Sequence, residues 1–591
     1  MTNTSRRQFL TQSAGLAAVG SSAALVACGG SGGSSSPSPA QFLYGVASGD
    51  PLTDRIILWT HAKRPNQESD VNLTWQIATD FGFTSLVTSG TVVAANGAGN
   101  TAKVDATGLT AGKTYYFRFT DETGASSPIG TTRTLPEAAA ASVKFAVFSC
   151  TLYSAGFFNV YESALSSGAQ YAVHLGDYIY EYGSDAAKFG NTDATTTPAG
   201  TAVSLGRVVS PSNDIVSLTD YRTRYALYRS DTNLQQLHAK MPWITVWDDH
   251  EFANNAYMTG AQNHDPATQG DWATRKKIAA QVYHEWMPIR TDTSNLLKIY
   301  RKFDFGSLFT LHMVDTRIEG RTKQAYAWYG DPFDAKAQPQ PYLWADYAAG
   351  LTPTSNGVYP DAANKMMSDT QMNWLTTNIS SATTTWQIMG NQDIMAKLWY
   401  PVSVVQSFKD GTAAFKSAIG TYLNRKAGNP ANTASDTKVP LNLDSWDGYP
   451  INRETLLQTI RGTGKKLVVL SGDSHNAWFN DLRTLDGTTK VGVEFATASV
   501  TAPGYESAGL GDLAPYIDGS GVASGVNGTR AGLIDDVNYV DTKRRGYLLM
   551  TVTASSVKGE FVFVDTVRSK SYVASVGKTV SVATDLTATY S

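Results

Sequence analysis

The chain has 591 residues, a formal net charge of −3, and 17% charged against 11% aromatic residues. That length can bury the cores of two or more domains, and the composition excludes a disordered or coiled-coil protein. Basic and acidic residues are mixed along the sequence, so no concentrated basic face for binding nucleic acid is expected.

The first 28 residues have the features of an export signal. The sequence SRRQFL at 5–10 matches the twin-arginine consensus and precedes a weakly apolar run at 14–27, too short and too rich in Gly and Ser for a stable transmembrane helix. LVAC at 25–28 resembles a lipobox, in which Cys28 becomes the lipidated first residue; ordinary cleavage that discards Cys28 is the alternative. We expect export by the twin-arginine route to the periplasm or cell surface, with a lipid anchor at Cys28, or secretion. Residues 29–40, rich in Gly, Ser and Pro, predict a flexible tether.

Cysteine is scarce, with only Cys28 and Cys150 in the whole chain. Secreted proteins usually pair their cysteines, and Cys150 has no partner if Cys28 belongs to the signal. A free thiol in an oxidising compartment is either buried and inert or bound to a metal. Both interpretations of Cys150 stay open.

Residues 41–136 alternate short strands and turns, as at 55–59, 71–77 and 114–119. The segment LTAGKTYY at 109–116 resembles the tyrosine corner of immunoglobulin-like and fibronectin-type sandwiches. These features predict a small N-terminal β-sandwich domain, followed by a linker at 136–141.

Residues 142–591 change to buried strands followed by helices, which predicts an α/β layered catalytic domain. The expected helices lie at 218–228, 272–286 and 369–379, and β-like sequence after residue 546 predicts a β-rich C-terminal tail. The expected central strands are short apolar runs at 145–148, 171–175, 243–247, 309–314, 386–389 and 466–470.

Each of these six strands ends in polar residues. The carboxyl ends of strands form the ligand site of layered α/β proteins, so we expect these residues to meet at one edge. The segments that follow the strands are Ser149-Cys150, Gly176-Asp177 with Tyr180, Asp248-Asp249-His250-Glu251, Asp315-Thr316-Arg317, Gly390-Asn391-Gln392 and Gly472-Asp473-Ser474-His475.

Every such segment also has an interpretation without chemistry. A Gly-Asp pair after a strand is commonly a turn, but Asp177 and Tyr180, three residues apart, can converge on one cation. The acidic segment at 248–251 suits the first turn of a helix, yet its adjacent acids repel one another unless cations are present. Asp473 and His475 lie on one side of an extended segment, although a capped turn with a surface histidine has the same sequence.

The remaining histidines carry less information. His174 alternates within a strand and is expected to be a satisfied core residue. No role is assigned to the histidines that lack acids at ligand spacing, which are His61, His238, His264, His284 and His312.

With these motifs in place, the chain resembles the PhoD-like alkaline phosphatases, a branch of the metallophosphoesterases. The resemblance runs from about residue 42 to beyond 495. It rests on YGVASGDP at 44–51, WDDHE at 247–251, GNQ at 390–392 and SGDSH at 471–475. The family implies a β-sandwich followed by a four-layer αββα catalytic domain, and a ferric ion held partly by Cys and Tyr with calcium ions alongside.

Carried over to this sequence, the resemblance makes Cys150 the thiolate ligand, Asp177 the carboxylate bridging the metals, and Tyr180 the phenolate on iron. Asp473 and His475 complete the metal cage. The wider metallophosphoesterase pattern has Asp-x-His where this chain has Ser-Cys, and Gly-His-x-His where it has Gly-Asp-Ser-His. Both departures match the PhoD branch and argue against an all-histidine dinuclear site.

Asp249 stands where the wider pattern has a metal-binding Asn, and His250 where it has a histidine near the leaving group. Which of Asp248 and Asp249 binds metal is left open. Arg317 or Asn391 is expected to hold the remaining oxygens of the ester.

The donor types indicate the metals, because anionic donors, phenolate above all, suit Fe³⁺ and carboxylate or amide oxygens suit Ca²⁺. We expect an exported monomer that hydrolyses small phosphate monoesters, with some action on diesters, by attack of a metal-bound hydroxide. One alternative is a phosphodiesterase or phospholipase D-like enzyme on the same metal site. Another is an inert phosphatase-like surface binding protein, which the complete ligand set argues against.

Overall fold

The computed structural model describes residues 37–137, 140–184, 202–324, 364–521 and 532–591, apart from 434, 435, 437 and 441. The chain divides into two compact units, Met1–Ser38 and Pro39–Ser591, and all the elements below belong to the second. The export signal with Cys28 and most of the tether therefore lie outside the described residues. No helix in the described part is long and apolar enough to cross a membrane.

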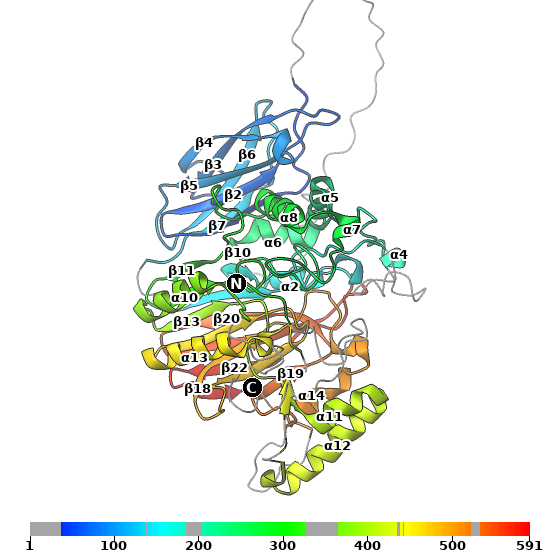
Figure 1. The fold of residues 1–591 in the computed structure, drawn as a ribbon. Helices are drawn as coiled ribbons and strands as arrows, with labels where there is room; N and C mark the ends of the chain where they lie inside the picture. The colour runs from blue at the N-terminus through cyan, green and yellow to red at the C-terminus, as the bar shows by residue number, and fades with distance from the viewer. Residues whose placement is uncertain are drawn as a thin grey trace, which may run out of the picture. The chain divides into compact units, whose positions relative to one another are not determined.

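The N-terminal domain consists of antiparallel strands in two layers (Figure 1). One sheet has the order β4-β3-β6-β7, and it faces β1, β2 and β5 across a common core. In β3 the side chains alternate between buried and exposed, as a half-buried strand requires. The hydroxyl of Tyr115 accepts a hydrogen bond from the backbone N–H of Thr110 at 2.8 Å, which is the contact of a tyrosine corner. The seven strands are β1 (Val46–Gly49), β2 (Arg55–His61), β3 (Val71–Ala78), β4 (Leu86–Ala94), β5 (Thr101–Thr107), β6 (Thr114–Asp121) and β7 (Gly130–Arg133).

One sheet of this domain continues into the catalytic domain, which the sequence did not indicate. Strand β1 pairs in parallel with β10 (Trp243–Thr245), where Gly49 lies opposite Trp243. A Cβ on Gly49 would lie 2.2 Å from the carbonyl oxygen of Pro288, so only glycine fits at this junction. The result is a ten-stranded sheet in the order β23-β22-β21-β20-β8-β9-β10-β1-β2-β5.

The β-rich C-terminal segment is part of this sheet rather than a tail. Strand β20 pairs with β8 on one side and β21 on the other. Seven of its eight residues are buried, so its sequence is that of a central strand. The strands that the catalytic domain contributes to this sheet are β8 (Val143–Phe148), β9 (Tyr171–His174), β10, β20 (Arg545–Val552), β21 (Ser556–Val564), β22 (Ala574–Ala583) and β23 (Ala588–Tyr590).

A second sheet of seven strands has the order β11-β12-β13-β16-β18-β17-β19. Its centre is parallel, from β12 through β13 and β16 to β18, and antiparallel strands flank it. The strands are β11 (Arg301–Phe305), β12 (Phe309–Met313), β13 (Trp386–Gly390), β16 (Lys466–Ser471), β17 (Ala477–Arg483), β18 (Lys490–Ala496) and β19 (Val537–Asp541). A separate pair joins β14 (Trp399–Pro401) to β15 (Lys438–Pro440).

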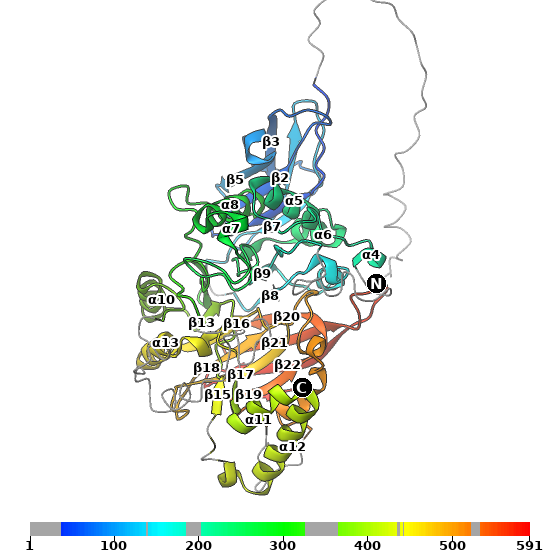
Figure 2. The same cartoon turned by 45° about the vertical axis from the view of Figure 1, so that its right-hand side comes forward.

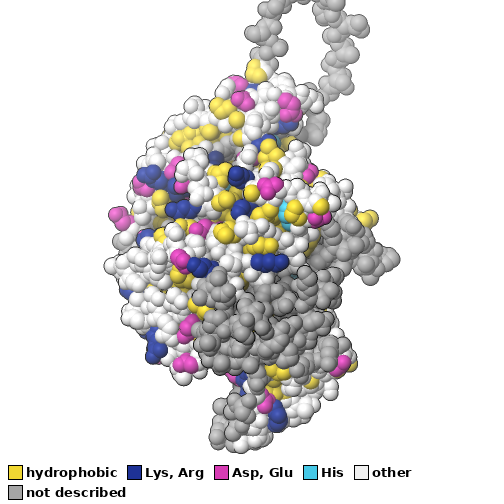
Figure 3. Space-filling view, viewed as in Figure 1, with side chains coloured by type: hydrophobic (Ala, Val, Ile, Leu, Met, Phe, Trp, Pro, Cys, Tyr) yellow, Lys and Arg dark blue, Asp and Glu magenta, His cyan; other side chains and the backbone are white. Residues whose placement is uncertain are grey.

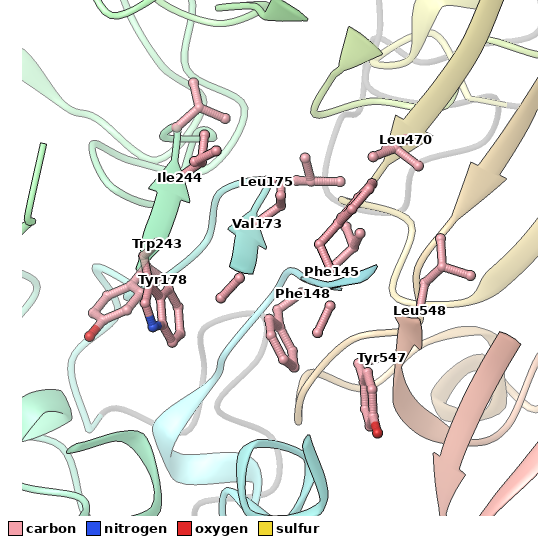
Figure 4. Packing of buried hydrophobic residues seen from close by; sticks show 14 of the residues in the cluster. Phe145, Phe148, Val173, Leu175, Tyr178, Trp243, Ile244, Leu470, Tyr547 and Leu548 are labelled. Atoms are coloured by element: carbon pink, nitrogen blue, oxygen red, sulfur yellow. The ribbon is translucent and has the colours of Figure 1, made fainter. Parts of the chain in front are cut away.

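The two sheets face each other across the main core. The rings of Phe145 on β8 and Phe309 on β12 lie 5.7 Å apart between centroids. Figure 4 shows Phe145 and Phe148 of β8 with side chains of β9, β10 and β20 in this core, and Leu470 of β16 beside them. The expected central strands are therefore all present, and they are divided between two packed sheets, as an αββα domain requires.

Helices cover the outer faces of the two sheets. Helices α10 and α13 lie side by side against the seven-stranded sheet in both views (Figures 1 and 2), and α2 and α6 pack on the other sheet. This arrangement confirms the predicted four-layer αββα domain after an N-terminal β-sandwich. The three expected helices are present as α5 (Leu218–Arg229), α8 (Trp272–Trp286) and α10 (Asp369–Ser381), each with a side-chain N-cap. The other α-helices are α2 (Asn159–Ala164), α4 (Ala202–Leu205), α6 (Thr232–Lys240), α7 (Pro266–Gln269), α11 (Val402–Gln406), α12 (Thr412–Gly428), α13 (Pro450–Thr463) and α14 (Ala514–Ile517).

The described surface has no single dominant charge on the face drawn in Figure 3. Lys and Arg side chains there are interspersed with Asp and Glu side chains. This distribution agrees with the low net charge of the chain.

Candidate metal centre

The loops that follow β8, β9 and β16 hold four of the expected metal ligands in a left-handed backbone conformation. Residues other than glycine rarely adopt positive φ, which costs of order 1–3 kcal/mol each and is concentrated at functional sites. The residues are Cys150 (φ 60°), Asp177 (φ 55°), Asp473 (φ 54°) and His475 (φ 60°).

Two glycines bring these loops close together. A Cβ on Gly176 would lie 2.3 Å from the Cβ of Asp248, and a Cβ on Gly472 would lie 2.8 Å from the Cβ of Ser149. Neither position can carry a side chain without moving its neighbour. The glycine before Asp177 and the glycine before Asp473 therefore serve the close approach of loops as well as the turn.

One group of converging ligand atoms combines sulfur, oxygen and nitrogen. Ligand atoms of Cys150, Asp177 and His475 lie within 4.8 Å of one another. The hydroxyl of Tyr180 donates to Oδ2 of Asp177 at 3.0 Å and lies 3.1 Å from Nε2 of His475. The expected thiolate and phenolate ligands of iron, Cys150 and Tyr180, thus meet the expected bridging carboxylate Asp177 and the expected ligand His475. Cys150 and Tyr180 are also buried.

The imidazole of His475 is held in the form that can bind a metal through Nε2. Its Nδ1 donates to the carbonyl oxygen of Pro503 at 2.6 Å. Burial lowers the pKa of His475 to about 4, so the ring is neutral near pH 7. With the proton on Nδ1, the lone pair of Nε2 faces Tyr180 and the rest of the group.

Further groups of converging atoms are acidic. Asp248, Asp249 and Asp473 form one, and Asp177 and Asp249 form another with His250. Oδ2 of Asp249 accepts from the backbone N–H of Asn255 at 2.5 Å, whereas its Oδ1 accepts no hydrogen bond among the described residues. Asp249 thus keeps a buried oxygen available for a cation.

Three of these carboxyl groups are poorly stabilised as anions by the protein alone, whereas Arg317 and His250 lower the pKa of Asp249 to about 2 against the effect of burial. Burial, together with neighbouring acids, raises the pKa of Asp177 well above its usual range and that of Asp473 to about 8, although Arg317 opposes the shift of Asp473. Burial also raises the pKa of Asp248 well above its usual range, against the effect of Arg317. Cations among these groups would relieve that repulsion, and the thiol, phenol, imidazole and carboxyl donors suit metal ions.

Arg317 lies among the carboxylates rather than open to a substrate. It is fully buried, its Nε donates to Asp248 at 2.5 Å, and its Nη1 donates to Asp444 at 2.6 Å. Its Nη2 lies 2.9 Å from Asp473 and 2.8 Å from Asp393. All three nitrogens of the guanidinium therefore already face a carboxylate. Little of the guanidinium is left for the expected contact with an ester oxygen.

Asn391 is likewise engaged within the protein. Its Oδ1 accepts a hydrogen bond from the indole N–H of Trp446 at 2.9 Å. Its Nδ2 donates to Oγ of Ser471 at 3.1 Å and to the carbonyl oxygen of Asp393. Both ends of the amide are occupied, so Asn391 braces the loop after β13 in this structure.

His250 has a buried carboxylate partner. Its Nδ1 lies 2.7 Å from Oε2 of Glu181, and its ring packs against that of Tyr180 at a tilt of 32°, with centroids 4.1 Å apart. Asp249 and Glu181 outweigh the opposing effect of burial and raise the pKa of His250 to about 9. Near pH 7 the ring therefore carries a proton on each nitrogen, with Nδ1 toward Glu181 and Nε2 on the other side.

Comparison with known proteins identifies the family. A model of the PhoD-like phosphatases matches residues 145–561, and a model of their N-terminal domain matches 27–136. The chain belongs to the PhoD-like phosphatase family. It is 31% identical over 483 residues to alkaline phosphatase D of Bacillus subtilis (strain 168), covering 78% of this chain and 70% of that protein. The solved structure titled "Structure of PhoD" matches with a TM-score of 0.71 and 26% identity over 95% of this chain and 93% of that one. The expected resemblance is confirmed, and the chain is a phosphoesterase of the alkaline phosphatase D type.

The sequence analysis missed several residues of this PhoD-like centre. Glu181 was passed over although it directly follows Tyr180, because nothing local pairs it with His250. Arg321, Asp393 and Asp444 were missed as well. Nη2 of Arg321 donates to Asp444 at 2.5 Å, and its Nη1 lies 3.3 Å from Asp393; ligand atoms of these two acids also converge with those of Asp473.

The remaining histidines of the PhoD-like chain are structural. His174 is buried, and its Nε2 lies 3.1 Å from the hydroxyl of Tyr161, as expected for a satisfied core residue. His238 is bonded to Tyr178 and His312 to Gln387. None of the five histidines left without a role belongs to a converging metal group among the described residues.

Proposed function

We propose that this PhoD-like phosphatase hydrolyses phosphate monoesters, with weaker action on diesters, at a centre of Fe³⁺ and Ca²⁺. The observation that carries the proposal is the convergence of Cys150, Asp177 and His475, with the hydroxyl of Tyr180 bonded to Asp177 and beside His475. Thiolate and phenolate together favour ferric iron over the harder divalent ions. The protein named alkaline phosphatase D, which the chain resembles over most of its length, supports a monoester substrate.

The donors divide into two sets. Cys150, Tyr180 and His475 would hold iron, and Asp177 lies where it can serve both metals. Calcium would take the all-carboxylate side, for which Asp249 has an oxygen without a hydrogen bond and Asp248 and Asp473 lie close by. When bound, the metals supply charge for the phosphoryl oxygens and a lowered pKa for water.

The protein's own groups prepare the site for that chemistry. Arg317 holds Asp248 and Asp473 in place, so we assign it to orienting ligands rather than to the ester. His250, fixed by Glu181, is the candidate to give a proton to the leaving oxygen through Nε2. Asn391 braces the loop after β13 and is not required to touch the substrate.

We further propose that the enzyme acts outside the cytoplasm as a monomer. The twin-arginine sequence at 5–10 supports export in a folded state, and LVAC at 25–28 supports a lipid anchor at Cys28. A small phosphate ester would then be hydrolysed in the periplasm or at the cell surface.

The deciding experiment compares kcat/KM for a monoester and a diester that share one leaving group. We expect the monoester to be favoured about tenfold or more, which is about 1.4 kcal/mol in transition-state stabilisation. A comparable preference for the diester would make the protein a phosphodiesterase, or a phospholipase D-like enzyme, on the same metal centre. If the metal-loaded protein hydrolyses neither ester, the remaining interpretation is an inert phosphatase-like binding protein.

A further inference from the structure

Glu251 ends the acidic segment at 248–251, yet it belongs to no group of converging ligand atoms among the described residues. Its side chain is 1% exposed. Oε1 accepts a hydrogen bond from the backbone N–H of Tyr178 at 2.6 Å, and Oε2 accepts from those of Asp177 at 2.9 Å and Asp248 at 2.8 Å. Both oxygens thus face donors, an arrangement that suits the ionised carboxylate and leaves no acceptor for a carboxylic acid proton.

The three N–H groups belong to two different loops. Asp177 and Tyr178 follow β9, whereas Asp248 follows β10. The same two loops touch at Gly176, where no Cβ can be placed beside Asp248. Glu251 therefore links the backbones of both loops at the point where each presents its carboxylate. A buried N–H that loses such an acceptor is left without a hydrogen-bond partner, which is unfavourable, so the link resists separation of the loops.

The distance between the loops matters because the acids of both loops converge. Ligand atoms of Asp177 and Asp249 lie in one group within 4.8 Å, and those of Asp248 and Asp249 in another. Calcium accepts oxygen ligands at about 2.3–2.6 Å, so a shift of roughly 1 Å between the loops would remove a ligand from its sphere. The spacing of these carboxylates is set by the backbone contacts of Glu251, together with one contact of a carboxylate itself, since Oδ1 of Asp177 accepts from the backbone N–H of His250 at 3.3 Å.

We propose that Glu251 is a positioning residue of the metal centre: it sets the distance between Asp177 and the pair Asp248 and Asp249, and through that distance the affinity for calcium. The inference rests on the proposed function, since it takes calcium as the ion on the carboxylate side.

Glu251→Gln tests the inference with little change in shape. The substitution turns one acceptor oxygen into an NH₂ group that faces a backbone N–H, so at least one of the three hydrogen bonds is lost. Asp447→Asn is the matched control, because Asp447 is also fully buried and accepts from the backbone N–H of Leu398 and the indole of Trp399 at 2.9 Å each. Asp447 belongs to no converging metal group among the described residues.

The measurement is titration calorimetry of calcium binding to the full-length, iron-loaded, calcium-depleted protein. We expect Glu251→Gln to bind calcium at least tenfold more weakly than the wild type, and Asp447→Asn to stay within twofold of it. Wild-type affinity in Glu251→Gln would overturn the inference, as would an equal loss in both variants, since a general loosening of the fold would then explain the loss.

Three further outcomes are decisive. If Glu251→Gln does not fold, Glu251→Asp keeps the charge but is too short to reach both loops, and it should show the same tenfold loss; normal affinity in it overturns the inference. A wild-type protein that hydrolyses esters but binds no calcium would overturn the calcium assignment and this inference together. Normal calcium binding without hydrolysis would count against the proposed function alone.

Discussion

Glu181 and His250 form a buried pair, with Oε2 of Glu181 2.7 Å from Nδ1 of His250. The other oxygen of Glu181 accepts from the backbone N–H of Asn254 and the side chain of Asn263, both at 2.7 Å. The carboxylate is thus held from the far side, and it fixes the orientation of the imidazole. A change at Glu181 alters His250 without removing any proposed metal ligand.

We expect Glu181→Gln to lower kcat by about 10- to 100-fold on an alkyl phosphate, which is less than the roughly 10²–10⁴-fold contribution of a general acid because the imidazole of His250 remains. The loss should be smaller on an aryl phosphate, because a good leaving group needs less help from a proton. Kinetics on both esters and the iron content of the variant are the measurements. Asn263→Ala, which keeps the carboxylate, is the control and should lose much less. Equal losses on the two esters would remove His250 from the leaving-group role.

The iron-loaded protein should be coloured, because a phenolate bound to ferric iron gives a charge-transfer band. Tyr180→Phe should lose the band and most of the activity, since only the oxygen is removed. Tyr225→Phe is the matched control: Tyr225 is fully buried, and its hydroxyl makes no hydrogen bond among the described residues. Active, colourless wild-type protein that contains only zinc would contradict the iron assignment.

The thiol of Cys150 should react with thiol reagents only after the metals are removed. In protein that carries Cys28→Ala, Cys150 is the sole cysteine, so all labelling reports on this residue. A coordinated thiolate is blocked by its metal. Mass spectrometry before and after chelation is the measurement, and equal labelling in both states would favour an inert core cysteine.

Fractionation of cells that express the full-length chain tests the proposed anchor. We expect Cys28→Ala to release the mature protein from the membrane fraction, because it removes the site of lipidation. Replacing both Arg6 and Arg7 by Lys should instead keep the precursor in the cytoplasm. An unchanged distribution of Cys28→Ala would favour simple secretion.

Protonation of the buried histidines should lower the free energy of unfolding as the pH drops below about 6.5, whereas buried carboxyl groups with a raised pKa, such as Asp473, act in the opposite direction. Burial lowers the pKa of His174 and His284 to about 3, and that of His61 and His312 to about 4. Because these histidines bind protons at higher pH when unfolded, acidification favours the unfolded chain between pH 6.5 and about 4. Denaturant unfolding at several pH values gives the slope of the free energy of unfolding against pH. The slope reports how many more protons the unfolded chain binds than the folded one. His312→Gln, which cannot titrate, should reduce that number by about one, and an unaltered slope would contradict this account.

The sequence predicted what local patterns determine. The apolar runs at 171–175 and 466–470 end in Asp177 and His475 as expected, because strand length and the polar residue that ends it are properties of a few neighbouring residues. Glu181 with His250, and Asp393 with Arg317, pair across about 70 residues of chain, and no local pattern marks them. The continuation of β1 into β10 depends on a single close contact at Gly49, which the sequence shows only as one more glycine.

The order of the ten-stranded sheet also constrains when the centre can form. Strand β8, which leads to Cys150, pairs on one side with β20, whose residues are made about 400 positions later. During synthesis this edge of β8 has no partner until almost the whole chain has left the ribosome, and pairings so distant in sequence are slow to form. We therefore expect the ligand loops to be assembled late in folding. Loss of the last 50 residues should harm metal binding as much as loss of a ligand.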